Sequence, residues 1–499
     1  MSRSLLKHRR ILRGLLFLGI LYLLLLIPSP SPTVPPVEQS GSSRQFIWNQ
    51  DARWDSLEAS YAAARKAGCA AERPLLETSR RSLETLLTRI ESDSLTPDSP
   101  QLSQLESGFF SLAPLVGACP ESVPAYLTLA SRLRTVLKHK SEHWNLDDRS
   151  TRETIYRLLY GARSAVEEVI LQTPPGDHPP ALLEGTDEPS VTPSATLLGV
   201  TIHSGDILVS RGGAPTSALI ARGNDFPGNF SHIALVHIDS GSGKVSIIES
   251  HIERGVVIST PEEYLHDTKL RVMVLRLRSD LPATISDPLI PHRSSSFMLR
   301  RVLERHIAYD FSMDYADSTR LFCSEVASSA YAAFGVRLWM GISHLSTPGV
   351  RSWLGDFGVD HFETQEPSDL EYDPQLRVVA EWRDPETLRK DHIDNAVTDA
   401  MLEGAERGDR LAYNPFLLPP SRFMKAYSAI LNLFGIVAPV PEGMSATTVL
   451  YHKFYSERHG AGVAAVSKDA ERFRAERGFE PPYWEMLKMA RRALATTPG

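Results

Sequence analysis

Two residues in this chain, Cys323 and His232, have the chemistry that covalent catalysis needs. Cys323 lies in the run Phe-Cys-Ser-Glu-Val, where a loop is predicted to turn into a helix. A thiol at a helix N-terminus experiences the positive end of the helix dipole, which favours the thiolate. His232 opens the apolar run His-Ile-Ala-Leu-Val, which is typical of a strand. An imidazole within reach of that thiol would complete a nucleophile–base pair.

A third residue should orient the imidazole, and the sequence offers two candidates, Glu249 and His251. They are two positions apart, so they share one face of a strand if the strand continues through both. An anionic partner stabilises an imidazolium directly, which favours Glu249, and His251 stays its rival. A metal site built from His232, Glu249, His251 and Cys323 lacks the short paired spacing of structural zinc sites, so no metal is expected.

The elements that must position these residues form a pattern of short strands and tight turns. Strands are predicted at 205–210, 232–238, 244–249, 255–258 and 271–277, and Gly-Ser-Gly at 241–243 suits a hairpin. Helical periodicity is found at 215–222, 294–306 and 324–334. We therefore expect an α+β domain with an antiparallel sheet at 197–365.

The rest of the chain is predicted to be mainly helical. Residues 49–172 indicate a helical domain, with strong apolar periodicity at 124–139 and 149–171, and residues 366–499 indicate a mainly helical C-terminal region. Pro-rich stretches at 28–48 and 173–196 are predicted linkers. Residues 430–440 are apolar but too short to span a membrane, so a core helix or a surface-contact segment is expected there.

Residues 1–27 have the pattern of a targeting segment. Five basic residues precede an uncharged run of 14 residues, Gly14 to Ile27, which is roughly 21 Å as a helix. Pro-Ser-Pro follows where a cleavage site would need small residues, so an uncleaved signal anchor is preferred to a cleaved signal peptide. The basic flank places the body outside the cytoplasm, as for a bacterial inner-membrane protein facing the periplasm.

Composition and cysteine count limit the class of protein. With 499 residues, 23% charged residues and a net charge of −7, the chain is an ordinary globular protein with no sign of a nucleic-acid partner. There is no Gly-rich phosphate loop or paired Cys-x-x-Cys motif, so no cofactor is expected. Three cysteines outside the cytosol suggest one disulfide, Cys69–Cys119, and one free thiol; the alternative is that Cys69 and Cys119 are buried apolar residues.

The order of these motifs resembles a known family. Gly-Asp-Ile-Leu at 205–208, Ser-His-Ile-Ala-Leu-Val at 231–236, an acid that ends the next strand, and then Phe-Cys-Ser-Glu-Val at 322–326 are similar to the permuted NlpC/P60 papain-like hydrolases, especially the YiiX/YebB-like enzymes. The histidine precedes the cysteine, which is the permuted order. The resemblance covers about residues 200–350 and implies that Cys323 is the nucleophile and His232 the base. Asp206, Tyr309 and Asp310 also match recurrent positions.

The resemblance implies a thiol hydrolase, or thiol protease, that cleaves an amide bond in a cell-wall peptide or an acyl amide through a thioester. With the N-terminal anchor, this predicts a membrane-tethered enzyme whose partners are that substrate and the membrane. Two alternatives remain open. One is an acyltransferase similar to lecithin-retinol acyltransferase, and the other is an inactive papain-like binding or scaffold domain.

Overall fold

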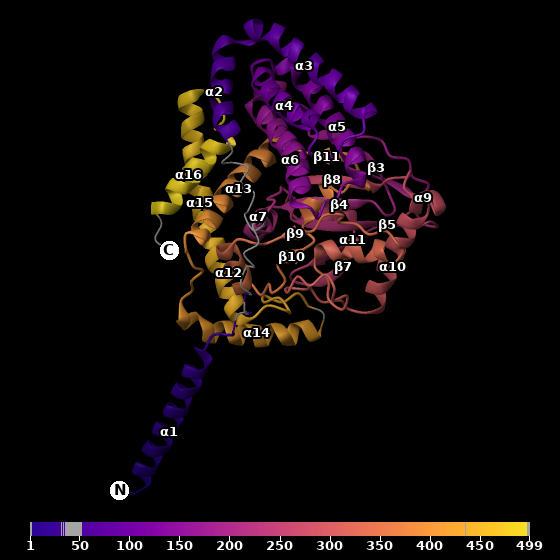
Figure 1. The fold of residues 1–499 in the computed structure, drawn as a ribbon. Coiled ribbons are helices and arrows are strands. Elements are labelled where there is room, and N and C mark those ends of the chain that lie inside the picture. Colours follow the sequence, from indigo (N-terminus) through magenta and orange to yellow (C-terminus); the bar gives the residue numbers. More distant parts are fainter. Residues whose placement is uncertain (1, 31, 33, 35–51, 435, 497–499) are drawn as a thin grey trace.

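The computed structural model describes residues 2–30, 32, 34, 52–434 and 436–496. Residues 1–27 were predicted to be a signal anchor, and within them α1 (Ser2–Leu25) projects away from the body (Figure 1). Across the described ranges, the structure contains no helix with the length and apolar content needed to cross a membrane. Most of the predicted linker 28–48, residues 31, 33 and 35–48, lies outside the described residues.

A seven-stranded antiparallel sheet forms the centre of the body, in the order β1-β11-β8-β4-β5-β6-β7. The five predicted strands are all present, and the α+β class is confirmed. The strands are β1 (Leu182–Glu184), β4 (Ile207–Gly212), β5 (His232–Ile238), β6 (Val245–His251), β7 (Gly255–Ser259), β8 (Lys269–Leu277) and β11 (Leu376–Trp382).

Alternating side chains of the central strands build a core on each face of the sheet. Ile207 and Val209 of β4 pack with residues of α10 (Ile290–Glu304) and α11 (Cys323–Ala332), whereas Leu208 packs on the other face. That second face is covered in part by the hairpin β2 (Ser194–Leu197) and β3 (Val200–His203). This period-two pattern fixes which side chains face α11.

The sheet extends past the predicted domain boundaries on both sides. Strand β11 pairs with β8, although it falls in the predicted helical C-terminal region, and β1 pairs with β11 from within the predicted linker 173–196. The core of the domain is therefore completed by strands that lie outside 197–365. Both strands are distant in sequence from their partners, so local periodicity does not assign them to the sheet.

Helices surround the sheet. The N-terminal group is α2 (Ala52–Ala67), α3 (Cys69–Ser92), α4 (Pro100–Ala118), α5 (Val123–Lys140) and α6 (Arg149–Gln172), and they share one apolar core. Within the sheet domain lie α7 (Pro215–Arg222), α8 (Pro261–His266) and α9 (Pro282–Ser286). The C-terminal group is α12 (Pro348–Asp356), α13 (Pro385–Glu406), α14 (Leu418–Leu433), α15 (Ala446–Arg477) and α16 (Tyr483–Thr496). The short paired strands β9 (Ser343–His344) and β10 (Glu363–Thr364) flank α12 in the chain.

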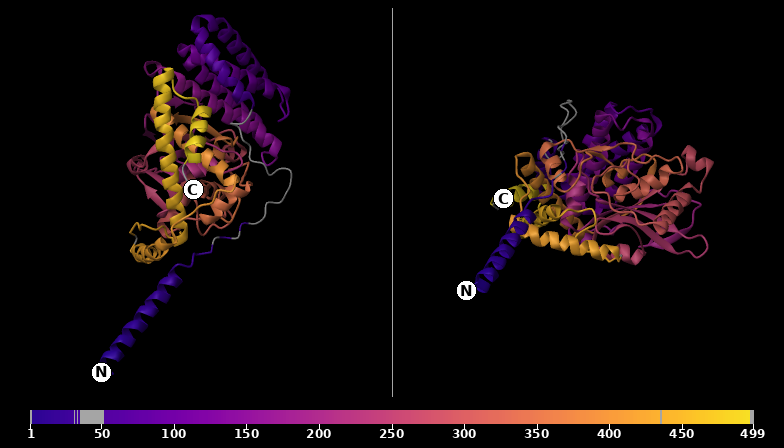
Figure 2. Two further views of the ribbon diagram at one scale, coloured as in Figure 1. Left: turned by 90° about the vertical axis from the view of Figure 1, so that its left-hand side faces the viewer. Right: turned by 90° about the horizontal axis from the view of Figure 1, so that it is seen from below.

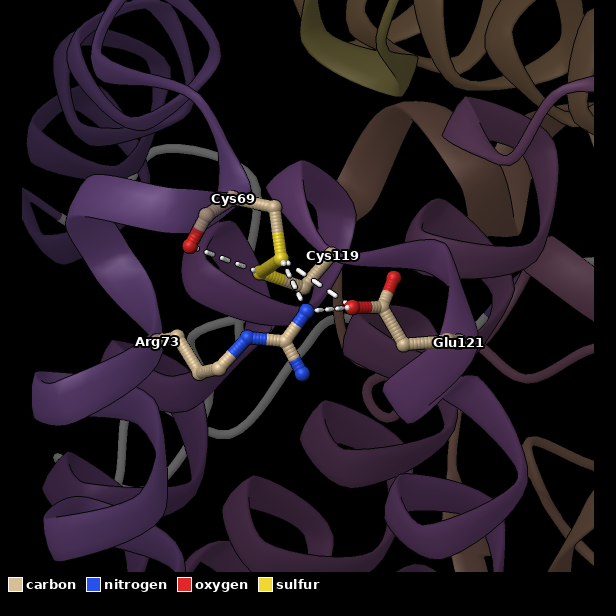
Figure 3. Close-up of a disulfide and its surroundings, with 4 residues drawn as sticks. All are labelled: Cys69, Arg73, Cys119 and Glu121. Carbon is tan, nitrogen blue, oxygen red and sulfur yellow. Dashed lines mark hydrogen bonds and ion pairs between the residues drawn. A yellow bond between two sulfur atoms is a disulfide. The ribbon is translucent and has the colours of Figure 1, made fainter.

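The two helical groups meet at the side of the body. Helix α16 lies beside α2, with the rings of Tyr61 and Trp484 6.3 Å apart (Figures 1 and 2). The predicted Cys69–Cys119 disulfide is present in the N-terminal group and joins the start of α3 to the end of α4, beside the Arg73–Glu121 ion pair (Figure 3). Cys323 is the free thiol.

Candidate active site

Cys323 is the first residue of α11 and is buried, with 4% of its surface exposed. The chain just before it is held by two hydrogen bonds. The Leu321 N–H donates to the Ala308 carbonyl at 3.1 Å, and the Ser250 hydroxyl of β6 donates to the Leu321 carbonyl at 2.7 Å. The Cys323 Sγ lies 3.9 Å from the carbonyl oxygen of Ser231, the residue before His232. The start of α11 is thus fixed against the strands that carry the histidines.

His232 begins β5, and Glu249 lies on the neighbouring strand β6. The strand register pairs Ala234 with Glu249, which brings the His232 side chain to the same end of the two strands. The His232 Nε2 lies 2.8 Å from the Glu249 Oε2. A carboxylate accepts hydrogen bonds, so Nε2 carries the proton and Nδ1 is left as the basic nitrogen.

His251, the rival to Glu249, contacts the same carboxylate. Its Nε2 lies 3.1 Å from the Glu249 Oε1, and the Ser259 hydroxyl donates to that oxygen at 2.7 Å. The rings of His232 and His251 meet edge to face at 5.7 Å. Glu249 is therefore the residue in hydrogen-bond contact with His232, and His251 and Ser259 hold the carboxylate from its other side.

Cys323, His232 and His251 line one cavity of about 560 Å³. Tyr309 and Lys269 add polar groups to its wall. The C-terminal region completes the wall, with apolar side chains between 439 and 449 and then His452 of α15. Segments far apart in the sequence thus enclose the candidate nucleophile, and the cavity is large enough for a small organic group.

Burial decides the charge state of the resting site. It raises the pKa of the Cys323 thiol to about 12, so the predicted effect of the helix dipole is outweighed. Burial also lowers the pKa of His232, against the opposing effect of Glu249. The two histidines hold the pKa of Glu249 well below its usual range despite its burial. The resting site therefore holds a neutral thiol, a neutral imidazole and an ionised carboxylate.

Two other sequence-predicted positions support the fold around the site. Asp206 is buried, accepts a hydrogen bond from the His203 N–H at 2.7 Å and pairs with Arg276 at 2.9 Å, which is a structural arrangement. Asp310 accepts hydrogen bonds from the backbone of its own loop, including the Asp314 N–H at 2.8 Å. Its neighbour Tyr309 faces the cavity, where burial raises its tyrosine pKa well above the usual value.

Asn229-Phe230-Ser231 has the sequence of a glycosylation sequon, and it lies inside the protein. Asn229 is buried, and its side-chain amide donates to Glu167 at 3.4 Å. Its neighbour Phe230 is fully buried as well. A glycan on Asn229 is incompatible with this fold.

Of the four residues considered from the sequence as a metal site, the structure brings three together. Ligand atoms of His232, Glu249 and His251 lie within 4.8 Å of one another in the part of the chain that the structure describes, and Cys323 is not in that group. The two imidazoles already contact the carboxylate oxygens at hydrogen-bond distance. The same atoms thus serve as an orienting network around His232.

Glu366 is a neighbour of the thiol that sequence reasoning missed. Its carboxyl is buried, which raises its pKa well above the usual value, and it also acts to raise the pKa of Cys323. Its Oε2 has no hydrogen-bond partner among the described residues. Glu366 lies just beyond the predicted domain and in no motif, so only the tertiary structure reveals it.

Comparison with known proteins gives one match. Residues 201–380 match the family model described as permuted papain-like amidase enzyme, YaeF/YiiX, C92 family. No curated protein and no solved structure matches the chain. The matched range begins in β3 and ends in β11, so it includes the strand that the sequence had placed outside the domain. Residues 201–380 are therefore similar to the permuted papain-like amidases of the C92 family, which supports a cysteine hydrolase of the amidase type in this part of the chain.

Proposed function

We propose that this chain cleaves an amide bond with Cys323 as nucleophile, His232 as general base and Glu249 as the residue that orients the imidazole. The observation that carries the proposal is the 2.8 Å contact between Glu249 and His232, because His232 lines the same cavity as Cys323. A nucleophile, a base and a group that orients the base are the three parts that covalent acyl transfer requires.

The chemistry follows from the neutral resting state. The His232 Nδ1 removes the proton from the Cys323 thiol as sulfur attacks the carbonyl carbon, and Glu249 stabilises the imidazolium that forms. The Cys323 N–H is at the first helical position, so it has no acceptor within its own helix and can donate to the developing oxyanion. His232 then protonates the leaving amine. Water, activated by the same imidazole, hydrolyses the thioester.

We further propose that the enzyme works at a membrane outside the cytoplasm, held there by its N-terminal segment. Basic residues precede the uncharged run in this segment, and the side chains of Leu15 to Leu24 that the structure describes are largely exposed. The candidate substrates are a cell-wall peptide and a fatty-acyl amide. In cells, the proposal predicts that the protein sediments with the membrane fraction and resists extraction by high salt.

Trapping the acyl-enzyme tests the catalytic proposal. The full-length protein is incubated with an N-palmitoyl amino acid or with a short peptide amide, then quenched in acid and analysed by mass spectrometry. We expect one acyl adduct on the peptide that contains Cys323, removable by neutral hydroxylamine and absent in Cys323→Ala. If neither substrate class gives an adduct or a product, the amidase proposal fails and a binding or scaffold role is left.

The same experiment separates hydrolysis from acyl transfer. An acyltransferase keeps water out and passes the acyl group to an alcohol or amine. Added glycerol or a primary amine should therefore leave the product of this enzyme as the free acid. A product that is mainly the ester or the new amide would favour the acyltransferase alternative.

A further inference from the structure

Helix α14 carries an apolar face that points away from the protein. Large apolar side chains recur along it and its two flanks at helical spacing, and each is more than half exposed. In contrast, Leu418 and Ser428 of the same helix are fully buried against the body. We define the α14 face as Phe416, Phe423, Tyr427, Ile430, Phe434 and Val437.

Such a face is unusual for a helix of a globular protein. The six large apolar side chains of this face form one stripe along the helix and its flanks, and two of them are at least two-thirds exposed. A contiguous apolar patch of this kind marks an interaction site. Elsewhere in the described chain, apart from α1, exposed large apolar residues are scattered, as at Ile285 and Leu303. The helix is 16 residues long, about 24 Å, which is too short to cross a bilayer.

The position of α14 indicates what covers this face. It lies across the end of the body from which α1 projects (Figures 1 and 2), and the two helices are in contact. The Arg422 guanidinium of α14 donates to the carbonyl of Ile27, just after α1. Leu15 to Leu24 of α1 are exposed as well. The two apolar surfaces are therefore adjacent and both are open to the surroundings.

The charge pattern suits a lipid surface. Residues 411–441 contain no Asp or Glu and two basic residues, Arg422 and Lys425. Helices that lie in the plane of a membrane combine an apolar face with basic residues near the polar side. Tyr427 supplies an aromatic ring of the kind enriched at the boundary between lipid and water.

The α14 segment also connects this surface to the cavity. The Lys425 ammonium donates to the Pro441 carbonyl at 2.8 Å, and the Val440 N–H donates to the Ser428 hydroxyl at 3.1 Å. These bonds fold the segment after α14 back over the helix, where Pro439 and Pro441 form part of the cavity wall next to Cys323. A surface that receives α14 therefore lies next to the cavity.

From these contacts we propose that α14 lies flat on a phospholipid bilayer, with the α14 face in the interfacial layer, and brings the cavity to substrates held in that membrane. This extends the proposed membrane tethering, because it gives the body a second contact with lipid. A membrane-held amide could then reach Cys323 without first leaving the bilayer for water.

The depth of single labels in the full-length chain tests the proposal. In a Cys323→Ser background, Cys69 and Cys119 are joined, so one engineered cysteine carries an environment-sensitive fluorophore. Ile430→Cys reports α14, and Leu303→Cys, at an exposed apolar position of α10, is the control. Liposomes of phosphatidylcholine and phosphatidylglycerol carry a quencher on the acyl chains, and iodide quenches from water.

We expect the Ile430 label to be quenched by lipid at least several-fold more than the Leu303 label, and iodide to give the reverse order. Equal behaviour of the two labels in a chain that floats with the liposomes would overturn docking and leave the tether intact. An Ile430 label shielded from both quenchers would mean that a protein surface, such as a second copy, covers the face. The quenching measurements do not require catalytic activity, so their outcome is independent of the acyl-enzyme test.

A charged variant tests whether the face itself makes the contact. Phe423→Glu/Tyr427→Glu should expose a label at Phe434→Cys to iodide, whereas Ile285→Glu/Leu303→Glu, at exposed apolar positions outside the α14 face, should not. If the label at 434 stays in lipid in the first variant, the apolar face is not what holds α14 at the membrane, and the proposal is wrong.

Discussion

At the scale of single residues, the helix dipole and burial act in opposite directions on Cys323. The dipole at the start of α11 favours the thiolate by about 1 kcal/mol or less. Burial of the thiol raises its pKa to about 12, which corresponds to a much larger preference for the neutral form. His232 has a lowered pKa and stays neutral near pH 7, so no ion pair is present before substrate binds.

This charge state predicts the reactivity of the free thiol. Alkylation of Cys323 by iodoacetamide should be slow at pH 7 and should keep rising with pH beyond 8.5, the value for a free cysteine. The rate is measured by mass spectrometry of the Cys323 peptide from pH 5 to 11. Cys69 and Cys119 do not interfere, because they are joined. A plateau in the rate below pH 8 would contradict the prediction and indicate a preformed thiolate.

Replacing Glu249 and His251 in turn should show which of them orients the His232 imidazole. Glu249→Gln keeps the shape but removes the anion 2.8 Å from His232, so kcat should fall by about 10²- to 10⁴-fold. His251→Gln, which changes only the support of the carboxylate, should cost less than about tenfold. Both are measured with the substrate that acylates Cys323. A larger loss in His251→Gln would make His251 the orienting residue.

The pH profile of activity should follow His232. The base must be unprotonated, so kcat/KM falls as the pH drops through the His232 pKa, which burial places below the usual 6.5. The acidic limb should thus have its midpoint below pH 6.5. Glu249 raises the pKa of His232, so Glu249→Gln should move that midpoint to still lower pH. A shift to higher pH in the variant would contradict this assignment.

At the scale of elements, local patterns predicted most of what surrounds the site. The structure has β5 at His232–Ile238 and α7 at Pro215–Arg222, as the sequence predicted, because apolar alternation and helical spacing are local properties. Local patterns do not reveal strands recruited from a distance. β11 pairs with β8 about a hundred residues earlier. Residues between 439 and 449 reach the cavity, and Glu366 acts on the Cys323 thiol, only through the tertiary fold.

The disulfide belongs to the element scale, since it joins the start of α3 to the end of α4. The bridge closes a loop with a sequence separation of 50, so Cys69→Ala/Cys119→Ala should lower the free energy of unfolding by about 3–4 kcal/mol. Urea unfolding followed by circular dichroism measures the change. A reducing agent should destabilise the wild type by a similar amount and leave the double variant unchanged. Equal sensitivity of both proteins would rule out the bridge as the cause.

At the scale of the whole molecule, buried charges connect the helical groups to the sheet. Glu167 of α6 pairs with Arg271 of β8 and lies 3.0 Å from His392 of α13. Asp391 of α13 pairs with Arg271 as well, and its Oδ1 lies 3.1 Å from the Nε of Arg211 in β4. The N-terminal helices, the sheet and the C-terminal helices therefore depend on one another for charge compensation, although the sequence had divided them into separate regions.

Replacing Asp391 tests whether buried ion pairs hold the helical groups and the sheet together. It is fully buried, and Asp391→Ala leaves the buried Arg211 without its contacting carboxylate, which should lower the free energy of unfolding by about 3–5 kcal/mol. Glu457→Ala, which breaks an exposed pair with Lys453 in α15, is the control and should change it by about 0.5 kcal/mol or less. If both variants unfold at the wild-type urea concentration, buried charge does not join the three parts, and apolar packing alone must account for their association. If Asp391→Ala loses the signals of the sheet and of both helical groups in one transition at lower urea, the sheet and its flanking helices unfold as one cooperative unit.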